Sequence, residues 1–181
     1  LPEQYAVFVD QYLTDLPDFA RAGTKSPLSG NYYISLGHFF EEIQNKLGRE
    51  VMIACHPRRQ RESEDPFDGF HSIFHKTYEL IASSDVVIAH YSNSIYWAVL
   101  LNKPILFIST DELKDTFTVQ KIEEVAKELN QKVVNIDDNI PLDLSGCIYS
   151  EETRDAFIEK HIVYDKSERS KTYNIIYTTL F

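Results

Sequence analysis

The feature that most constrains the fold is a series of short, almost wholly apolar runs without the alternation of a half-buried strand. Four of them occupy residues 5–9, 51–55, 86–89 and 105–108 and are rich in Val, Ile, Ala and Phe. Strands buried on both faces have this composition, which is typical of the parallel strands in α/β proteins. We expect each run to be a central strand of a parallel sheet, with a further strand at residues 132–135.

Segments of helical character separate the expected strands. Between Tyr32 and Leu47 apolar residues recur with helical spacing, and Gly48 follows as a C-terminal stop. Further helices are expected at about residues 76–83, for about eight residues after Ser94, and at residues 119–129, 151–161 and 170–179. Such alternation of strands and helices is what a Rossmann-like, doubly wound α/β sheet requires. The sequence therefore predicts one α/β domain over residues 1–181, with helices at its C-terminal end.

Composition restricts the classes of ligand. The 181 residues include 18 Lys and Arg against 28 Asp and Glu, a net charge of −10. This charge argues against general attraction to nucleic acid or to an anionic membrane surface, so a phosphate would have to bind locally. No run approaches the roughly 20 apolar residues of a membrane span. Because Cys55 and Cys147 form no CxxC pair, we expect reduced thiols and a cytoplasmic location.

The start of the chain suggests a longer polypeptide. The first residue is Leu1 rather than Met, and a polar turn leads from it into the first apolar strand. This pattern is neither a signal peptide nor a transit peptide. We expect an upstream domain, although removal of a short leader would leave the same trace.

Polar clusters directly follow three of the expected strands. They are Asp10 with Gln11, the run from His56 to Arg59, and the run from His90 to Ser94. In an open parallel sheet, ligands bind outside the carboxyl ends of the strands. We therefore expect the three clusters to meet at one edge of the sheet and to line a ligand site.

The cluster after the third strand is the most informative of the three. Ser92 and Ser94 lie at the expected start of a helix, where free backbone N–H groups and the positive end of the helix dipole favour an anion such as a nucleotide phosphate. Simple capping of the helix explains the same serines, because Ser and Asn are preferred capping residues. Both interpretations stay open on the sequence alone.

A His-Pro pair marks the second cluster. The rigid turn at Pro57 would fix the His56 imidazole at a strand end, where it can hydrogen-bond a phosphate or sugar oxygen. A plain turn is the simpler interpretation of such a pair. We expect Arg58 and Arg59 to be a solvated charge pair, and the polar segment of residues 58–68 to lie outside the core.

Together, these motifs resemble a known family. The pair His56-Pro57, followed by the serine-rich turn within residues 85–108, is similar to the C-terminal, donor-binding domain of bacterial two-Rossmann-domain (GT-B) glycosyltransferases. These enzymes build capsule and lipopolysaccharide glycans. The sequence looks most like their sialyltransferases, polysialyltransferases and glycerophosphotransferases, in which HP and paired-serine motifs hold the cytidine nucleotide of the donor. The resemblance covers residues 5–109 well and the tail only in outline.

The resemblance implies a metal-independent transferase without a cofactor, whose substrate is a nucleotide sugar linked through CMP or CDP. His56 would be catalytic, because it would stabilise the departing nucleotide. Pro57 would shape the turn, and Ser92 and Ser94 would bind phosphate oxygens. Further candidates for nucleotide or phosphate contact are Arg58, Lys76, Thr77, Tyr91 and Asn93, with Asp10 and Gln11 proposed only from their place at a strand end.

The resemblance also implies partners outside this chain. In such enzymes the catalytic base and most of the site for the glycan acceptor belong to the N-terminal domain of the same polypeptide. We therefore expect the present domain to bind donor without efficient transfer. Nucleic acid is not an expected partner, while peripheral association of the full-length protein with the inner face of the bacterial inner membrane stays open.

Three other interpretations remain. A nucleotide-sugar 2-epimerase shares the two-domain fold, but its acidic and arginine groups around the sugar have no clear counterpart in this sequence. A non-catalytic nucleotide-binding module on the same sheet is compatible with the negative charge. A metal site at His71, His75 and His90 is less favoured, because Ser72 replaces the Glu of an HExxH motif. We expect His71 and His75 to flank a buried turn.

Overall fold

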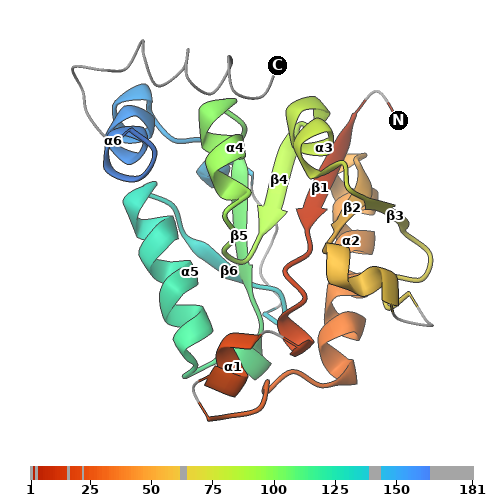
Figure 1. The fold of residues 1–181 in the computed structure, drawn as a ribbon. Coiled ribbons are helices and arrows are strands. Elements are labelled where there is room, and N and C mark those ends of the chain that lie inside the picture. The colour runs from red at the N-terminus through yellow and green to blue at the C-terminus, as the bar shows by residue number, and fades with distance from the viewer. Residues whose placement is uncertain are drawn as a thin grey trace.

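The computed structural model describes residues 2, 4–15, 17–21, 23–61, 65–138 and 144–163. They form an α/β fold around a six-stranded parallel sheet with the strand order β3-β2-β1-β4-β5-β6 (Figure 1). This is the Rossmann order, in which β2 and β3 follow one another on one side of β1, and β4, β5 and β6 follow on the other side. The prediction of a doubly wound parallel sheet is confirmed.

The central strands owe their apolar sequences to burial on both faces. The strands are β1 (Tyr5–Val9), β2 (Glu50–Cys55), β3 (His71–Phe74), β4 (Val86–Ala89), β5 (Ile105–Ser109) and β6 (Val133–Asn135). Every residue of β1, β4 and β5 is buried. Because β1 pairs in parallel with both β2 and β4, the carboxyl ends of these three strands lie at the same edge of the sheet.

The strand β3 was not predicted, and the expectation that His71 and His75 flank a buried turn is wrong. Residues 71–74 pair in parallel with β2, with Phe74 opposite Cys55. Their side chains are exposed or half-buried, as befits the edge of a sheet. A strand that is not covered on both faces lacks the continuous apolar run that marks the central strands.

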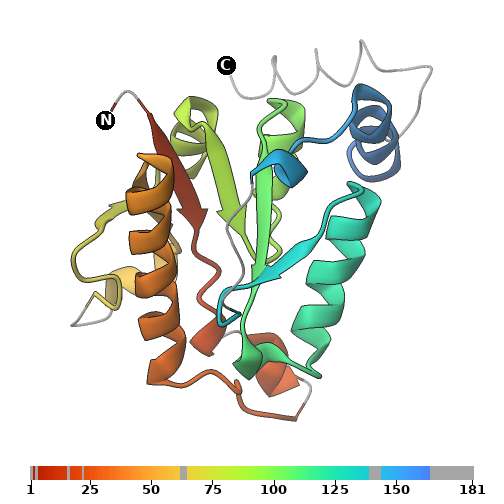
Figure 2. The same cartoon turned by 180° about the vertical axis from the view of Figure 1, so that it is seen from behind.

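Helices cover both faces of the sheet (Figures 1 and 2). They are α1 (Pro17–Arg21), α2 (Gly30–Leu47), α3 (Thr77–Ser83), α4 (Ile95–Leu100), α5 (Phe117–Glu128) and α6 (Glu151–His161), with 3-10 turns η1 (Leu13–Asp15), η2 (Pro57–Arg61), η3 (Asp111–Leu113) and η4 (Ser145–Cys147). Along β1, Ala6 and Phe8 belong to the core under α2. Val7 and Val9 belong to the core under α3, α4, α5 and α6. One strand thus serves both layers.

The helix α2 has the predicted periodicity. Its buried side chains are Tyr32, Leu36, Phe39, Phe40 and Ile43. It begins at Gly30 rather than Tyr32, because the Ser29 side chain accepts the Asn31 N–H and caps the helix. It ends at Gly48, whose φ of 59° lies in the left-handed region that glycine adopts without steric cost.

Other elements differ from the predictions at their ends. Between β1 and α2, where no helix is expected from the sequence, lie η1 and α1. The helix α4 has six residues instead of about eight, and α5 begins at Phe117 because Thr116 caps it. The helix expected at residues 151–161 is confirmed, whereas the one expected at residues 170–179 lies outside the described residues. Among the described helices, none combines the length and apolarity needed to cross a bilayer.

Candidate functional site

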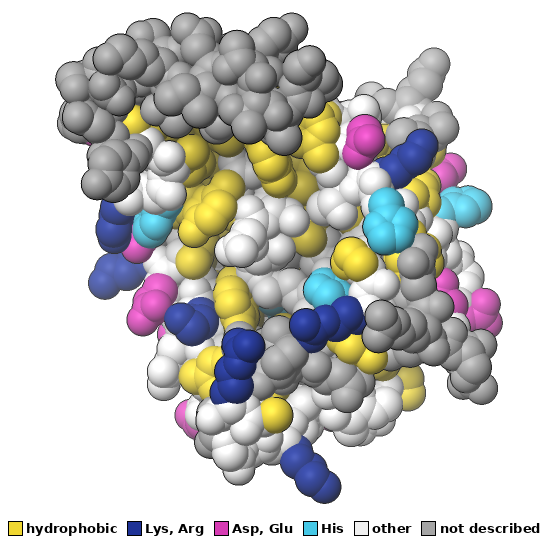
Figure 3. Space-filling model, in the orientation of Figure 1, with side chains coloured by type: hydrophobic (Ala, Val, Ile, Leu, Met, Phe, Trp, Pro, Cys, Tyr) yellow, Lys and Arg dark blue, Asp and Glu magenta, His cyan; other side chains and the backbone are white. Residues whose placement is uncertain are grey.

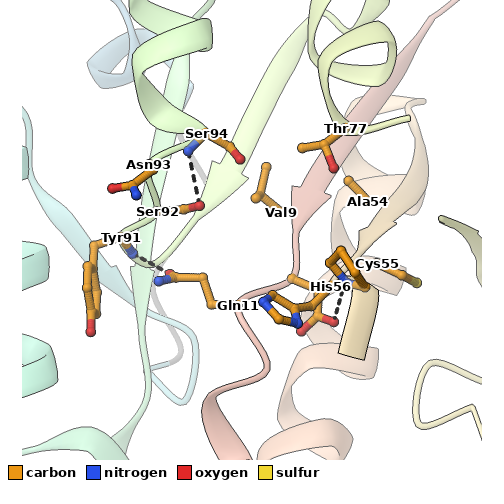
Figure 4. A pocket seen from close by; sticks show the side chains of 12 residues that line it. Val9, Gln11, Ala54, Cys55, His56, Thr77, Tyr91, Ser92, Asn93 and Ser94 are labelled. Atoms are coloured by element: carbon orange, nitrogen blue, oxygen red, sulfur yellow. Dashed lines mark hydrogen bonds between the residues drawn. The ribbon is translucent and has the colours of Figure 1, made fainter. Parts of the chain in front are cut away.

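A pocket of about 530 Å³ opens at the carboxyl ends of β1, β2 and β4, where the strand order reverses (Figure 4). Its lining comes from the ends of the strands and from the loops that follow them: Val9, Asp10, Gln11, Ala54, Cys55, His56, Pro57, Thr77, Tyr91, Ser92, Asn93 and Ser94. Ligands of open α/β sheets bind at such a switch point. The volume falls within the range of small-molecule sites, roughly 300–1,000 Å³.

The pocket brings together the three clusters expected at the strand ends. Of the candidates from the sequence, only Arg58 and Lys76 are absent from its lining, and both are exposed. Val9, Ala54 and Cys55 line the pocket without having been predicted, because a strand residue that faces a pocket has the same apolar character as one in the core.

The side of the pocket at β1 and β2, here called the histidine wall (Asp10, His56 and Pro57), is held by a buried ion pair. Arg59 Nε donates to Asp10 Oδ2 at 2.7 Å, and Arg59 Nη2 donates to Oδ1 at 2.9 Å. The side chains of Arg59 and Asp10 are 3% and 2% exposed. The expected solvated arginine pair is therefore wrong at Arg59, whose charge is buried against a bidentate partner.

Three aromatic rings enclose the Arg59 guanidinium. Its Cζ lies 4.7 Å from the ring centroid of Tyr12, 5.5 Å from that of Tyr33 and 5.2 Å from that of Phe67. These cation–π contacts accompany the bidentate pair and help to offset the loss of water around the charge. Phe67 is itself buried, so the expectation that residues 58–68 lie outside the core is wrong at Arg59 and Phe67.

Asp10 also orients His56 and Tyr12. Its Oδ2 accepts the backbone N–H of His56 at 3.0 Å, and its Oδ1 accepts that of Tyr12 at 2.9 Å. Tyr12 adopts a φ of 55°, which non-glycine residues rarely do, and its ring stacks on the His56 imidazole with 5.8 Å between centroids. No sequence motif marks Tyr12, because its position depends on the hydrogen bond from its backbone N–H to the side chain of Asp10.

Hydrogen bonding selects the tautomer of His56. Its Nδ1 accepts the backbone N–H of Arg58 at 3.3 Å, so the neutral ring carries its proton on Nε2. Burial lowers the pKa of His56 from its ordinary value, and the charges of Arg58 and Arg59 lower it further, against the opposite influence of Asp10. At neutral pH the ring is neutral, and Nε2–H is the donor that it can offer to a ligand.

The opposite side, here called the serine wall (Gln11, Tyr91, Ser92, Asn93 and Ser94), is held by neutral hydrogen bonds. Gln11 Oε1 accepts the Tyr91 N–H at 2.6 Å and ties the end of β1 to the turn after β4. Ser92 Oγ accepts the Ser94 N–H at 3.2 Å. Ser94 occupies the N-cap position of α4, but its side chain makes no capping bond.

This turn differs from the anion site that the sequence suggests. The N–H groups of residues 95–97 bond to the carbonyls of residues 92–94, and that of Ser94 bonds to Ser92. The donors of residues 94–97 are thus engaged inside the turn, and a helix as short as α4 has a small dipole. The hydroxyls of Ser92 and Ser94, rather than the helix terminus, are what this wall presents to the pocket (Figure 4).

His90 belongs to the core and not to the pocket. It is 0% exposed, its Nδ1 donates to the carbonyl of Ile108 at 2.8 Å, and its Nε2 accepts from the Tyr32 hydroxyl at 2.9 Å. Burial lowers the pKa of His90 to about 4, so the ring is neutral. Both ring nitrogens are engaged. Within the described part of the chain, no group of three or more His, Cys, Asp or Glu side chains could hold a metal ion.

Thr77 and Cys55 complete the lining beside the histidine wall. Thr77 is the first residue of α3 and adds a hydroxyl. Burial raises the pKa of the Cys55 thiol to about 11. Because the thiolate is the reactive form, Cys55 is an uncharged lining group rather than a nucleophile.

Charge is distributed unevenly over the surface. On the face shown in Figure 3, some Lys and Arg side chains lie near the centre and below it and others lie at the left outline, while Asp and Glu side chains lie mainly toward the outline.

Comparison of the sequence with protein-family models and with curated proteins finds no match in either case.

Proposed function

We propose that this chain is the donor-binding domain of a metal-independent glycosyltransferase and binds a nucleotide-activated sugar in the pocket between the two walls. One observation carries the proposal: the imidazole of His56 and the hydroxyls of Thr77, Ser92 and Ser94 line one pocket at the switch point of the sheet. Neutral N–H and O–H donors of this kind bind phosphate oxygens without a metal ion.

The proposed chemistry assigns a role to each wall. The Nε2–H of His56 donates to an oxygen of the departing nucleotide phosphate, and the hydroxyls of Ser92 and Ser94 bind the other phosphate oxygens. An acceptor hydroxyl bonds to the anomeric carbon and gives its proton to a base, while the bond from that carbon to the phosphate oxygen breaks and negative charge grows on that oxygen. Donors fixed in advance at this position stabilise the transition state. Asp10 and Arg59 act as positioning residues, because they hold His56 in place.

A non-catalytic nucleotide-binding module is the second candidate. It is favoured because the hydrogen bonds that Asp10 accepts leave this carboxylate unable to act as a base. Asp10 is the one carboxylate in the described lining, and its oxygens accept two hydrogen bonds from Arg59, one from His56 and one from Tyr12. These bonds occupy all of the roughly four acceptor positions of a carboxylate. A transferase would therefore need a base from elsewhere, for which we propose the N-terminal domain that would also bind the glycan acceptor.

Calorimetric titration with CMP, CDP, UDP and GDP tests the proposal. We expect one nucleotide to bind selectively, and we expect His56→Ala and the Ser92→Ala, Ser94→Ala double variant each to weaken binding about tenfold or more, the effect of losing a hydrogen bond to a charged group. His38 lies exposed on α2, so His38→Ala is the matched control and should bind as the unaltered protein does. If no nucleotide binds while circular dichroism shows intact folds, the proposal is wrong.

A further inference from the structure

Two exposed aromatic side chains stand beside the pocket. Tyr78 in the first turn of α3 is 48% exposed, and Trp97 in the first turn of α4 is 47% exposed. Their rings meet edge to face, with centroids 5.3 Å apart and planes at 79°. This contact joins the two helices and leaves about half of each side chain open to a ligand.

The position of the pair relative to the pocket follows from its neighbours. Tyr78 directly follows Thr77, and the Trp97 N–H donates to the carbonyl of Ser94. Thr77 and Ser94 both line the pocket, one from α3 and the other from α4 (Figure 4). Side chains in a helix lean toward its N-terminus. Both rings therefore lean toward the edge of the sheet where the pocket opens.

We propose that the Tyr78–Trp97 pair is the platform on which the planar base of a nucleotide stacks. This inference rests on the proposed function and extends it by assigning a subsite for the base. A nucleotide whose phosphate is held by Ser92, Ser94 and His56 reaches the pair where its base extends from the pocket toward the first turns of α3 and α4. Aromatic rings stack on any base, so the platform contributes affinity with little selectivity among bases.

The single tryptophan of the chain makes the inference directly measurable. Trp97 is the one tryptophan among the 181 residues, so fluorescence excited at the long-wavelength edge, where the 11 tyrosines do not absorb, reports on this side chain alone. We expect the nucleotide that binds in the calorimetric titration to change the Trp97 emission with the same dissociation constant. Ribose 5-phosphate, which lacks a base, should bind about tenfold more weakly and leave the emission unchanged.

Variants separate stacking from other uses of the same surface. We expect Trp97→Ala and Tyr78→Ala each to weaken nucleotide binding about tenfold, whereas Tyr78→Phe should retain most of the affinity because it keeps the ring. Leu100 is 43% exposed on α4, one turn farther from the pocket, so Leu100→Ala should bind as the unaltered protein does. Because all three side chains are exposed, we expect each variant to keep the fold.

The outcomes distinguish this inference from the proposed function. If calorimetry detects nucleotide binding while Trp97 emission stays constant and Trp97→Ala binds normally, the pair is not the platform, and the proposed function stands. A surface for a protein partner would give that result. If none of the nucleotides binds to the folded protein by calorimetry, both are overturned.

Discussion

The two walls of the pocket are stabilised by different forces. In the histidine wall, a buried ion pair between residues 49 positions apart holds the backbone of His56. In the serine wall, a short turn bonds to itself, and Gln11 adds one neutral hydrogen bond from β1. The first wall therefore depends on tertiary structure and on charge, whereas the second depends mainly on local sequence.

The largest expected effect comes from breaking the ion pair. Asp10→Ala leaves the Arg59 charge buried without its bidentate partner, which should lower the free energy of unfolding by about 3–5 kcal/mol. The Ser92→Ala, Ser94→Ala double variant should cost much less, about 1 kcal/mol, because only a neutral hydrogen bond is lost. Urea unfolding of both variants measures the contrast.

A double variant shows whether unpaired charge causes the loss. Asp10→Ala combined with Arg59→Met removes the charge and keeps an apolar stem of similar length, so part of the stability should return. If Asp10→Ala lowers the free energy of unfolding no more than the double serine variant does, the ion pair does not stabilise the histidine wall more strongly than neutral hydrogen bonds stabilise the serine wall.

The next effect concerns His90 and the dependence of stability on pH. Its pKa is about 4 in the folded protein against the ordinary value of 6.5. Between these values the unfolded chain binds a proton that the folded chain does not, so stability is full above pH 6.5 and falls on acidification. From pH 7 to pH 5 the loss should be about 2 kcal/mol.

Urea unfolding at the two pH values measures this loss, and His90→Asn corrects for other titrating groups. Asn retains an N–H donor near the position of Nδ1, but it does not titrate. The unaltered protein should lose more stability than His90→Asn between pH 7 and pH 5. Equal losses would mean that His90 is not responsible.

The smallest expected effect is the pH dependence of nucleotide binding. Burial keeps His56 neutral at neutral pH, and protonation below its lowered pKa adds a positive charge beside the phosphate. Affinity for CMP should then rise about fivefold, as expected for roughly 1 kcal/mol between unit charges 4 Å apart in water. His56→Gln keeps a donor but does not titrate. The difference between the pH profiles of CMP affinity for the unaltered protein and for His56→Gln therefore separates the titration of His56 from that of the phosphate. Identical profiles would contradict the contact.

Burial explains which parts of the fold were predictable from the sequence. β1, β4 and β5 are covered on both faces, and α2 on one, so composition and periodicity record their positions. β3 lies at the edge of the sheet and has no such pattern. The caps at Ser29 and Thr116, which set where α2 and α5 begin, became clear only in the structure.

The candidate site was predictable where strand ends alone determine it. Asp10, His56 and Ser92 meet because parallel strands place their carboxyl ends together. Arg59 was misjudged, because a charged side chain is seldom buried unless it is paired, and one sequence does not reveal a pairing across 49 positions. Tyr12 was not predicted for a different reason: its positive φ accompanies a local bond to Asp10, two residues earlier, which no motif marks.

Two consecutive residues after β1 join the two walls. The side chain of Asp10 bonds toward His56 on one side, and that of Gln11 bonds toward Tyr91 on the other. A single dipeptide thus ties both walls of the pocket to the end of β1. An insertion between these positions would shift one wall against the other and change the spacing between His56 and Ser92, even with every lining residue retained.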